Sequence, residues 1–297
     1  MSTSSGAPVV VGVDGSDSSL EAVRYAAVEA VSRHRPLRIV HAFAWPLLPA
    51  AAVPGAIPLP AEDMRQHAEV LLADATEQAG KAAPEVTVTA AILDGTAAQV
   101  LLREAGTAEL IVLGDRGLGP ISGLLLGSVA VQTVTHAACP VLVVRGQARP
   151  DGPVVVGVDG SPISMRALRA AAAAAELRRC DLVALHAWTG PASTGPGDML
   201  PLVYEPDTVE AEERLLLAEA VAAVAGDHPD VHITQKAVHG PAREHLIDWS
   251  RRAQLLVVGA RGRGGFAGLL LGSVSQHTMY QSACPTMVVR ADSPADA

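Results

Sequence analysis

The sequence predicts an α/β protein of two tandem doubly wound domains, each a parallel sheet with helices on both faces. The first observation is an internal repeat. The letters VVVGVDGS of residues 9–16 recur unchanged at 154–161, and GLLLGSV of 123–129 recurs at 268–274. The second is that strand and helix signals alternate along each half. The constant offset of 145 positions indicates two complete domains rather than short solenoid units.

The elements of the first half follow from its apolar runs and helical spacings. The valine-rich run 9–13 predicts a strand buried on both faces, and Ser18 or Ser19 can cap the helix after it. The proline-rich stretch 46–60 cannot form regular structure. The expected strands are 9–13, 37–42, 86–93, 110–113 and 141–144, and the expected helices are 18–33, 61–82, 97–105 and 128–137.

The second half repeats these signals, with strands expected at 154–158, 182–187, 231–238, 255–258 and 286–289. We expect domains at 1–147 and 148–297, joined through a segment rich in glycine, proline and charge at 146–153. Open parallel sheets bind ligands at the carboxyl ends of their strands, where the strand order reverses. If the first and fourth strands are neighbours there, the residues that follow them share one crevice.

Composition narrows the classes of function. The chain has 297 residues, 49% of them hydrophobic, and a net charge of −9, which suits packed cores and argues against a nucleic-acid or anionic-membrane partner. Residues 1–8 do not resemble a secretory signal, and no apolar run reaches the length of a membrane span. Three cysteines without a CxxC spacing fit a reducing, cytoplasmic location. Cys139 and Cys284 match in position and are expected to be buried, with a redox pair as the alternative.

A glycine pattern follows the fourth expected strand of each half. It reads Gly114-Asp115-Arg116-Gly117, nine residues, then Gly127-Ser128, and it recurs from Gly259 to Ser273. Single glycines could serve only as turn residues. The full pattern, present twice, favours a phosphate site, because glycine lets backbone N–H groups approach an anion and a helix N-terminus adds its dipole. Neither a Walker lysine nor the dinucleotide fingerprint accompanies it.

Charged residues near the pattern have two interpretations each. Asp14 and Asp159 follow the first strands and could form turns, cap helices or accept hydrogen bonds from ribose hydroxyls. Arg116, Arg261 and Arg263 are either solvated or in contact with phosphate. Leu118 stands at the position of Arg263, so the second site should be the more electropositive.

No catalytic or metal-binding arrangement emerges from the sequence. His41 and His186 end the second strands and are expected to be structural, and no spacing of histidines and carboxylates suits a metal ion. The acids near the two long loops, which are Glu62, Asp63, Asp198 and Glu205, form no constellation.

At these residues the chain resembles the universal stress protein family, in the tandem form common in mycobacteria and related actinobacteria. The resemblance implies a five-stranded parallel sheet ordered 3-2-1-4-5 and ATP as ligand, with or without Mg²⁺. Adenine is expected near Ala42 and Ala187. In the first half the implied contacts are Gly12, Asp14, Ala42, Gly114, Asp115, Arg116, Gly117, Leu118, Gly119, Gly127, Ser128 and Val129. In the second they are Gly157, Asp159, Ala187, Gly259, Ala260, Arg261, Gly262, Arg263, Gly264, Gly265, Gly272, Ser273 and Val274.

The resemblance also implies dimerisation through the last strand. A tandem chain can make that pairing internally, between 141–144 and 286–289, and form a homodimer in addition. We therefore expect a cytoplasmic, ATP-binding stress-response regulator with two sites and at most weak ATPase activity. The alternatives are a slow ATPase or nucleotidyl-transfer enzyme on the same fold, and a dimerisation module that needs no nucleotide.

Overall fold

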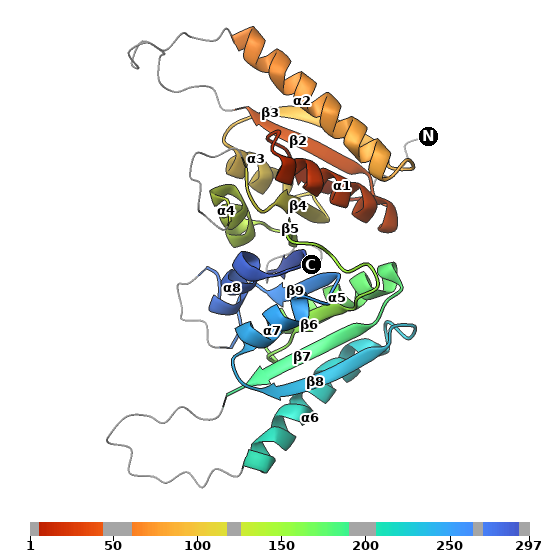
Figure 1. Ribbon diagram of the computed structural model, residues 1–297, viewed down its shortest axis with the longest axis vertical. Helices are drawn as coiled ribbons and strands as arrows, with labels where there is room; N and C mark the ends of the chain where they lie inside the picture. The colour runs from red at the N-terminus through yellow and green to blue at the C-terminus, as the bar shows by residue number, and fades with distance from the viewer. Residues whose placement is uncertain (1–5, 44–60, 118–125, 190–205, 264–269, 291–297) are drawn as a thin grey trace, which may run out of the picture. The chain divides into compact units, whose positions relative to one another are not determined.

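The computed structural model describes residues 6–43, 61–117, 126–189, 206–263 and 270–290. They form two compact units, which divide between Arg145 and Gly146. Each unit contains five parallel strands and four helices that alternate along the chain (Figure 1). The predicted fold class is therefore confirmed. Leu118, Gly119, Gly264, Gly265, Asp198, Glu205 and the proline-rich stretch 46–60 lie outside the described residues.

In the first unit the strand order is β3-β2-β1-β4-β5, and every neighbouring pair is parallel. The strands are β1 (Val9–Gly12), β2 (Leu37–Phe43), β3 (Val88–Asp94), β4 (Leu110–Gly114) and β5 (Val141–Val144). The helices are α1 (Asp17–Ser32), α2 (Ala61–Ala82), α3 (Ala97–Glu104) and α4 (Ser128–His136). Because β1 lies between β2 and β4, the strand order reverses there, as the crevice argument requires.

The second unit repeats this topology in the order β8-β7-β6-β9-β10. Its strands are β6 (Val154–Gly157), β7 (Leu182–Trp188), β8 (Ile233–His239), β9 (Leu255–Gly259) and β10 (Thr286–Val289). Its helices are α5 (Pro162–Arg178), α6 (Pro206–Ala225), α7 (Ala242–Ser250) and α8 (Ser273–Gln281).

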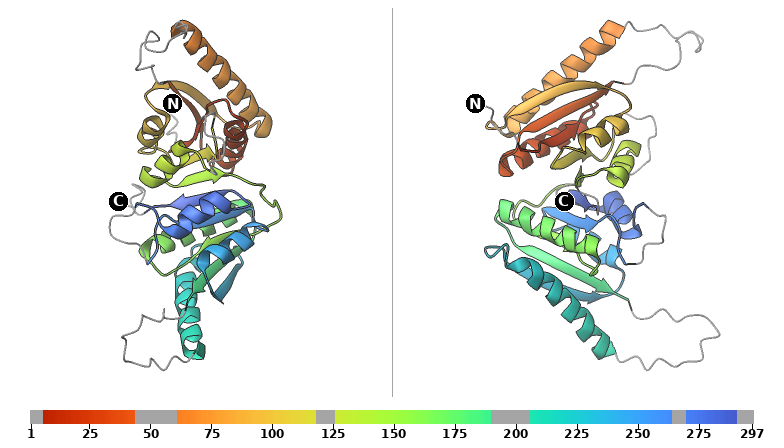
Figure 2. Two further views of the ribbon diagram at one scale, coloured as in Figure 1. Left: turned by 60° about the vertical axis from the view of Figure 1, so that its left-hand side comes forward. Right: turned by 180° about the vertical axis from the view of Figure 1, so that it is seen from behind.

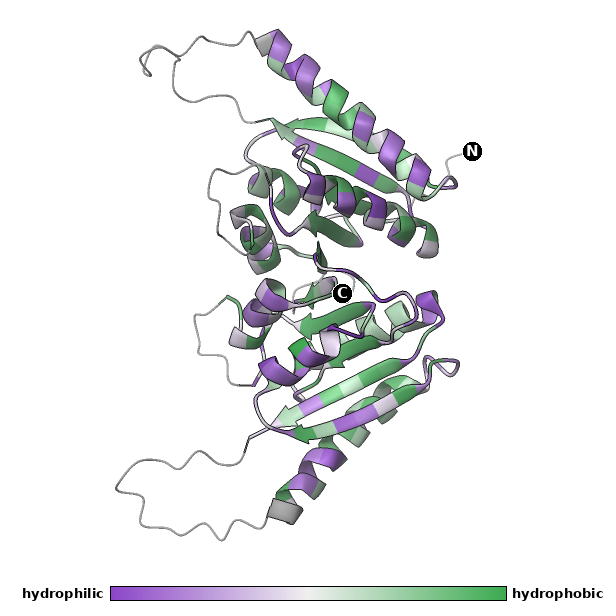
Figure 3. Cartoon of the chain, in the orientation of Figure 1, coloured by the Kyte–Doolittle hydropathy of each residue, from purple (hydrophilic) through white to green (hydrophobic). Residues whose placement is uncertain are grey.

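The helices of each unit pack in pairs over the sheet. In the first unit α1 contacts α2 and α3 contacts α4, and in the second α5 contacts α6 and α7 contacts α8 (Figure 2). The central strands consist mainly of fully buried aliphatic residues, such as Val9 to Val11 and Val154 to Val156. Figure 3 shows these strands as mostly hydrophobic, while α1, α2 and α7 carry hydrophilic residues along part of their length. A strand buried on both faces explains the continuous valine runs.

The predicted starts of three elements are wrong for identifiable reasons, and several predicted ends differ by one residue. Helix α1 is capped by Ser16, whose hydroxyl accepts a hydrogen bond from the N–H of Ser19, so Ser18 and Ser19 lie inside the helix. Strand β3 begins at Val88 because the N–H of Val86 closes a turn onto the carbonyl of Ala83. Strand β8 likewise begins at Ile233, because Val231 closes a turn onto His228.

Candidate functional site

In the first unit the aspartate that follows β1 lies against the glycine loop that follows β4. The Oδ1 atom of Asp14 accepts hydrogen bonds from the Ser16 N–H (3.0 Å) and hydroxyl (2.7 Å). The Oδ2 atom lies so close to Gly117 that a Cβ on this glycine would overlap with it. The turn that holds the aspartate contains Gly15 at φ +89°, a conformation that favours glycine. The carboxylate and the loop therefore form one packed unit.

The same loop is tied to two helix N-termini. A Cβ on Gly114 would come within 2.7 Å of the Ser18 carbonyl at the start of α1. The N–H of Gly127 donates to the Asp115 carbonyl (2.8 Å), which holds the end of the loop beside its beginning. Helix α4 then begins at Ser128 with Gly127 as its N-cap. Glycine has no side chain to accept from the first N–H groups of the helix, so these groups suit an anion.

A cavity of 340 Å³ opens between these elements in the first unit, which is within the usual range for small-ligand sites. Its polar lining comes from the turn after β1, the glycine loop and the start of α4. Its apolar lining comes mainly from the ends of β1, β2 and β4 and from α3. The lining residues are Gly12, Val13, Asp14, Ser19, Val40, His41, Ala42, Ala97, Val100, Leu101, Leu113, Gly114, Arg116, Gly117, Leu126, Gly127, Ser128, Val129 and Ala130.

The structure brings most of the predicted first-half residues into this lining. Asp115 is different: its side chain is only 14% exposed and accepts a hydrogen bond from the Ser18 hydroxyl (2.8 Å). Arg116 lines the cavity and exposes 68% of its side chain, and its contact with phosphate stays a prediction.

Sequence reasoning missed the face of α3 that lines the cavity. Ala97, Val100 and Leu101 have the spacing of a core-facing helix stripe, which does not distinguish a protein core from a ligand pocket.

The second unit places its aspartate and glycine loop in the same relation. Asp159 Oδ1 accepts from the Ser161 N–H (2.9 Å), and its Oδ2 accepts from the Arg263 N–H (2.8 Å). A Cβ on Gly262 would overlap with this carboxylate. Burial by itself would raise the pKa of Asp159, but hydrogen bonds from Ser161, Arg263 and Ser164 outweigh it and lower that pKa. The carboxylate is thus held ionised beside the loop.

The remaining predicted residues of the second unit follow the same plan. Gly157 packs against Leu246 of α7, and a Cβ on Gly259 would come within 2.8 Å of Ile163 in α5. The N–H of Gly272 donates to the Ala260 carbonyl (2.8 Å), and α8 begins at Ser273. Of the residues predicted for adenine and phosphate, Ala187 lies near the end of β7, Arg261 is exposed in the loop and Val274 lies in the first turn of α8.

The two histidines at the ends of the second strands have structural partners. His41 Nδ1 lies 2.9 Å from the Val13 carbonyl, and His186 Nδ1 lies 2.7 Å from the Val158 carbonyl, so each fastens the end of its second strand to the first. His186 also pairs with Glu213 of α6 (2.7 Å). Their predicted structural role is confirmed, and His41 lines the cavity as well.

Other groups of the described residues add no second centre. Cys139 and Cys284 are buried, and burial raises the pKa of these thiols to about 12 and about 11. Within the described ranges, no three histidine, cysteine or acidic side chains gather as metal ligands. None of the described helices is long and apolar enough to cross a membrane.

Comparison with known proteins agrees with this geometry. The model of the universal stress protein family matches residues 7–145 and 152–290. The chain belongs to the universal stress protein family. Universal stress proteins of Mycobacterium tuberculosis and Mycolicibacterium smegmatis are 37% and 36% identical to it over 294 residues, covering 95% of this chain and 96% of each relative.

A solved structure shows the same fold over the whole length. A universal stress protein from Archaeoglobus fulgidus superposes with a TM-score of 0.70 at 17% identity, and the match covers 96% of each chain. The tandem arrangement of two universal stress domains is therefore shared with relatives over nearly their full length.

Proposed function

We propose that each unit binds ATP, or another adenine nucleotide, in the crevice between its first and fourth strands. The observation that carries the proposal is the packing of Asp14 against Gly117 at the edge of a 340 Å³ cavity. A carboxylate that accepts hydrogen bonds, a glycine loop and an uncapped helix N-terminus are the groups that ribose and phosphate require. The apolar lining beside Ala42 and Val100 suits a flat heterocycle.

In this arrangement each part of the nucleotide has a protein partner. Asp14 accepts from the ribose hydroxyls, the N–H groups of the glycine loop and of Ser128 receive the phosphates, and adenine lies beside Ala42. ATP binds with or without Mg²⁺. Because Asp14 already contacts the loop, a bound nucleotide touches α1, the loop and α4 together. Occupancy then modulates the conformation of the unit and its choice of partners, including a second copy of the chain, in a cytoplasmic stress response.

Binding without efficient hydrolysis is part of the proposal. Asp14 is the single carboxylate among the described lining residues, and it is already engaged by Ser16. Glu62 and Asp63, two of the acids that could serve the enzyme alternative, are exposed in the first turn of α2. Steady release of phosphate from ATP at more than a few turnovers per minute, abolished by the variant Asp14→Asn/Asp159→Asn, would favour that alternative.

The direct test is the nucleotide content of the protein. Full-length protein purified without added nucleotide is denatured, and the released compounds are identified and counted by anion-exchange chromatography. We expect up to two adenine nucleotides per chain, and strongly reduced content in the double variant Asp14→Asn/Asp159→Asn. Absence of nucleotide from the wild type, together with no heat of binding when ATP is added, would overturn the proposal. It would favour the alternative of a dimerisation module that needs no nucleotide.

A further inference from the structure

The two crevices carry different charge around otherwise equivalent frameworks. The offset of 145 residues relates the two sets of charged positions around the crevices. The first set is Asp14, Asp115, Arg116 and Arg145, and the second is Asp159, Arg261, Arg263 and Arg290, with Ala260 at the position of Asp115. The formal charges of the first set cancel, whereas the second set has an excess of two positive charges.

In the first unit the carboxylate of Asp115 neutralises the loop from within. Its Oδ1 atom accepts from the Ser18 hydroxyl (2.8 Å), and its Oδ2 atom lies 3.6 Å from the Nε atom of Arg116. Arg145, which follows β5, also interacts with this charge. Burial lowers the pKa of Arg145, whereas the negative charge of Asp115 raises it. The positive side chains near this phosphate position are therefore balanced before a ligand arrives.

In the second unit the position that corresponds to Asp115 carries no charge. Ala260 replaces the aspartate, and Ile163 replaces the serine that would hold it. The backbone N–H of Arg263 donates to Asp159, and its guanidinium group lies against Gly160, next to that aspartate. Gly160 has φ +76° and no side chain, which leaves room for the guanidinium. A positive side chain is thus held at the point where the phosphate chain would enter.

We propose that the two crevices divide adenine nucleotides by phosphate charge: the second selects a nucleoside triphosphate, and the first accepts adenylates that carry fewer negative charges. The inference rests on the proposed function, since it presumes that both crevices bind adenine nucleotides. Arg263 is the specificity-determining residue of the second site, and Asp115 is that of the first.

The size of the effect follows from Coulomb's law. ATP has about two more negative charges than AMP, and the second crevice has two more positive charges than the first. For separations of about 8 Å in water at 20 mM salt, these interactions change the relative affinity for ATP over AMP by roughly tenfold. At 0.5 M salt screening reduces the change to about twofold. The salt dependence separates this explanation from a difference in shape.

The test uses the full chain with one site weakened at a time. Asp159→Ala leaves the first crevice to report binding, and Asp14→Ala leaves the second. Dissociation constants for ATP and AMP are measured by titration calorimetry in 20 mM and 0.5 M NaCl. We expect the ratio Kd(AMP)/Kd(ATP) to be roughly tenfold higher at the second site in low salt. If a single-site chain does not fold, the two-site isotherms of the wild type and of Arg263→Leu are compared, because the constants that change belong to the second site.

Two arginine variants identify the residue responsible. Arg263→Leu copies the leucine of the first loop and should lower the ratio at the second site toward that of the first. Arg251→Leu removes the same charge from the end of α7, where the side chain is 70% exposed and pairs with Asp248, and should leave the ratio unchanged. Equal ratios at both sites would overturn this inference while the proposed function stands. Failure of both sites to bind ATP or AMP would instead overturn the proposed function.

Discussion

The Oδ2 atom of Asp159 accepts a hydrogen bond of 2.8 Å from the backbone N–H of Arg263, across 104 residues of sequence. The same carboxylate blocks the space that a side chain on Gly262 would need. A residue proposed for ribose binding therefore also fixes the loop proposed for phosphate binding. A change in the carboxylate should therefore alter the loop, and a change in the loop should alter the carboxylate. The first two predictions use this coupling.

The pH dependence of stability should contain a contribution from Asp159. Its pKa is lowered in the folded chain, so its stabilisation is fully present above the unfolded value of about 3.9 and is lost as the pH falls through the lower folded value. Thermal unfolding of wild type and Asp159→Asn should differ most at pH 6–8 and converge below about pH 4. The exposed control Asp248→Asn should show little difference at any pH. A constant gap between wild type and Asp159→Asn down to pH 3 would contradict the prediction.

Gly117→Ala and Gly262→Ala should reduce both nucleotide content and stability. The added Cβ overlaps with Asp14 or Asp159, so the loop or the carboxylate must move. Gly80→Ala and Gly226→Ala are matched controls, because no atom lies within 4 Å of the added methyl group. We expect a melting temperature lowered by several degrees for the loop variants, which corresponds to about 1–3 kcal/mol, and no loss for the controls.

A double variant separates packing from binding. In Gly117→Ala/Asp14→Ala the overlapping carboxylate is gone, so stability should recover part of the loss while nucleotide binding at the first site stays absent. Additive losses of stability in the double variant would show that the overlap is not the cause.

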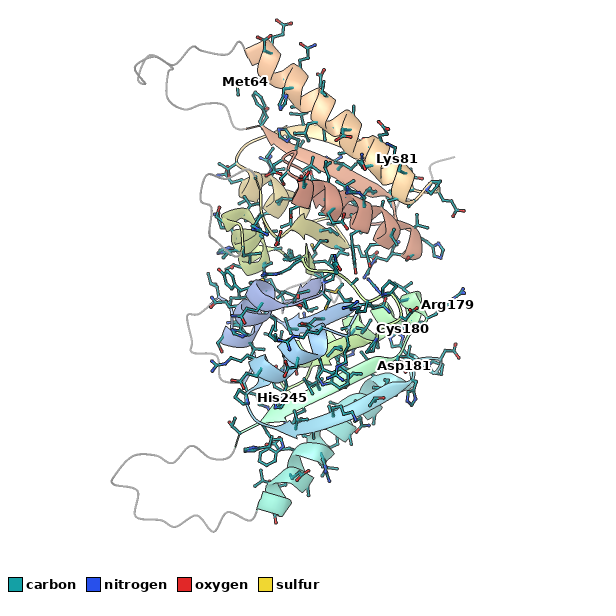
Figure 4. All side chains as sticks on the ribbon, viewed as in Figure 1. Met64, Lys81, Arg179, Cys180, Asp181 and His245 are labelled. Atoms are coloured by element: carbon teal, nitrogen blue, oxygen red, sulfur yellow. The ribbon has the colours of Figure 1, made fainter. Side chains whose placement is uncertain are left out.

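The cysteines should react with a thiol reagent in an order set by burial. Cys139 and Cys284 have pKa values of about 12 and about 11, so at pH 8 the ionised fraction of each thiol is on the order of 10⁻³ or less. Cys180 is only partly buried, in the turn between α5 and β7 (Figure 4), although burial raises its pKa too. Native protein should therefore release about one equivalent of chromophore with Ellman's reagent before the other two. Rapid reaction of all three cysteines in the native protein would contradict this prediction.

Glu213→Ala should destabilise the second unit. His186 is 4% exposed, and its Nε2 atom would lose the carboxylate 2.7 Å away, a loss of about 1–3 kcal/mol for a buried polar atom left without its partner. The first unit has the buried Ala68 at the matching position, so this pair is specific to the second unit. Chemical denaturation should show the loss for Glu213→Ala, and the exposed control Glu212→Ala should stay within about 0.5 kcal/mol of wild type.

Much of the fold could be predicted because the duplication supplies each signal twice. Strand β5 (Val141–Val144) and strand β10 (Thr286–Val289) begin and end where the apolar runs do. The cap of α1 could not be fixed, because Ser16, Ser18 and Ser19 are all competent caps, and the choice depends on the turn that Asp14 and Gly15 impose. Local propensity does not contain that information.

The site was predictable where glycine spacing reports backbone approach, and less so where packing decides. The contact between Asp14 and Gly117 links positions 103 apart and requires the sheet to be assembled first. The hydrogen bond between Ser18 and Asp115 could not be predicted either, because the sequence around neither residue indicates a partner. The extra pair in the second unit, His186 with Glu213, depends on how α6 lies over β7.

The partnership of Ser18 with Asp115, replaced by Ile163 beside Gly259 and Ala260, limits how the duplicated halves can recombine. Equal length makes crossover between the two copies of the gene segment straightforward in principle. A crossover between the helix and the loop would place the aspartate opposite isoleucine, or leave the serine hydroxyl without its acceptor. The start of the first helix and the loop after the fourth strand of a half must therefore be inherited together. Exchange of short segments between the halves is then disfavoured, and their ligand preferences can diverge.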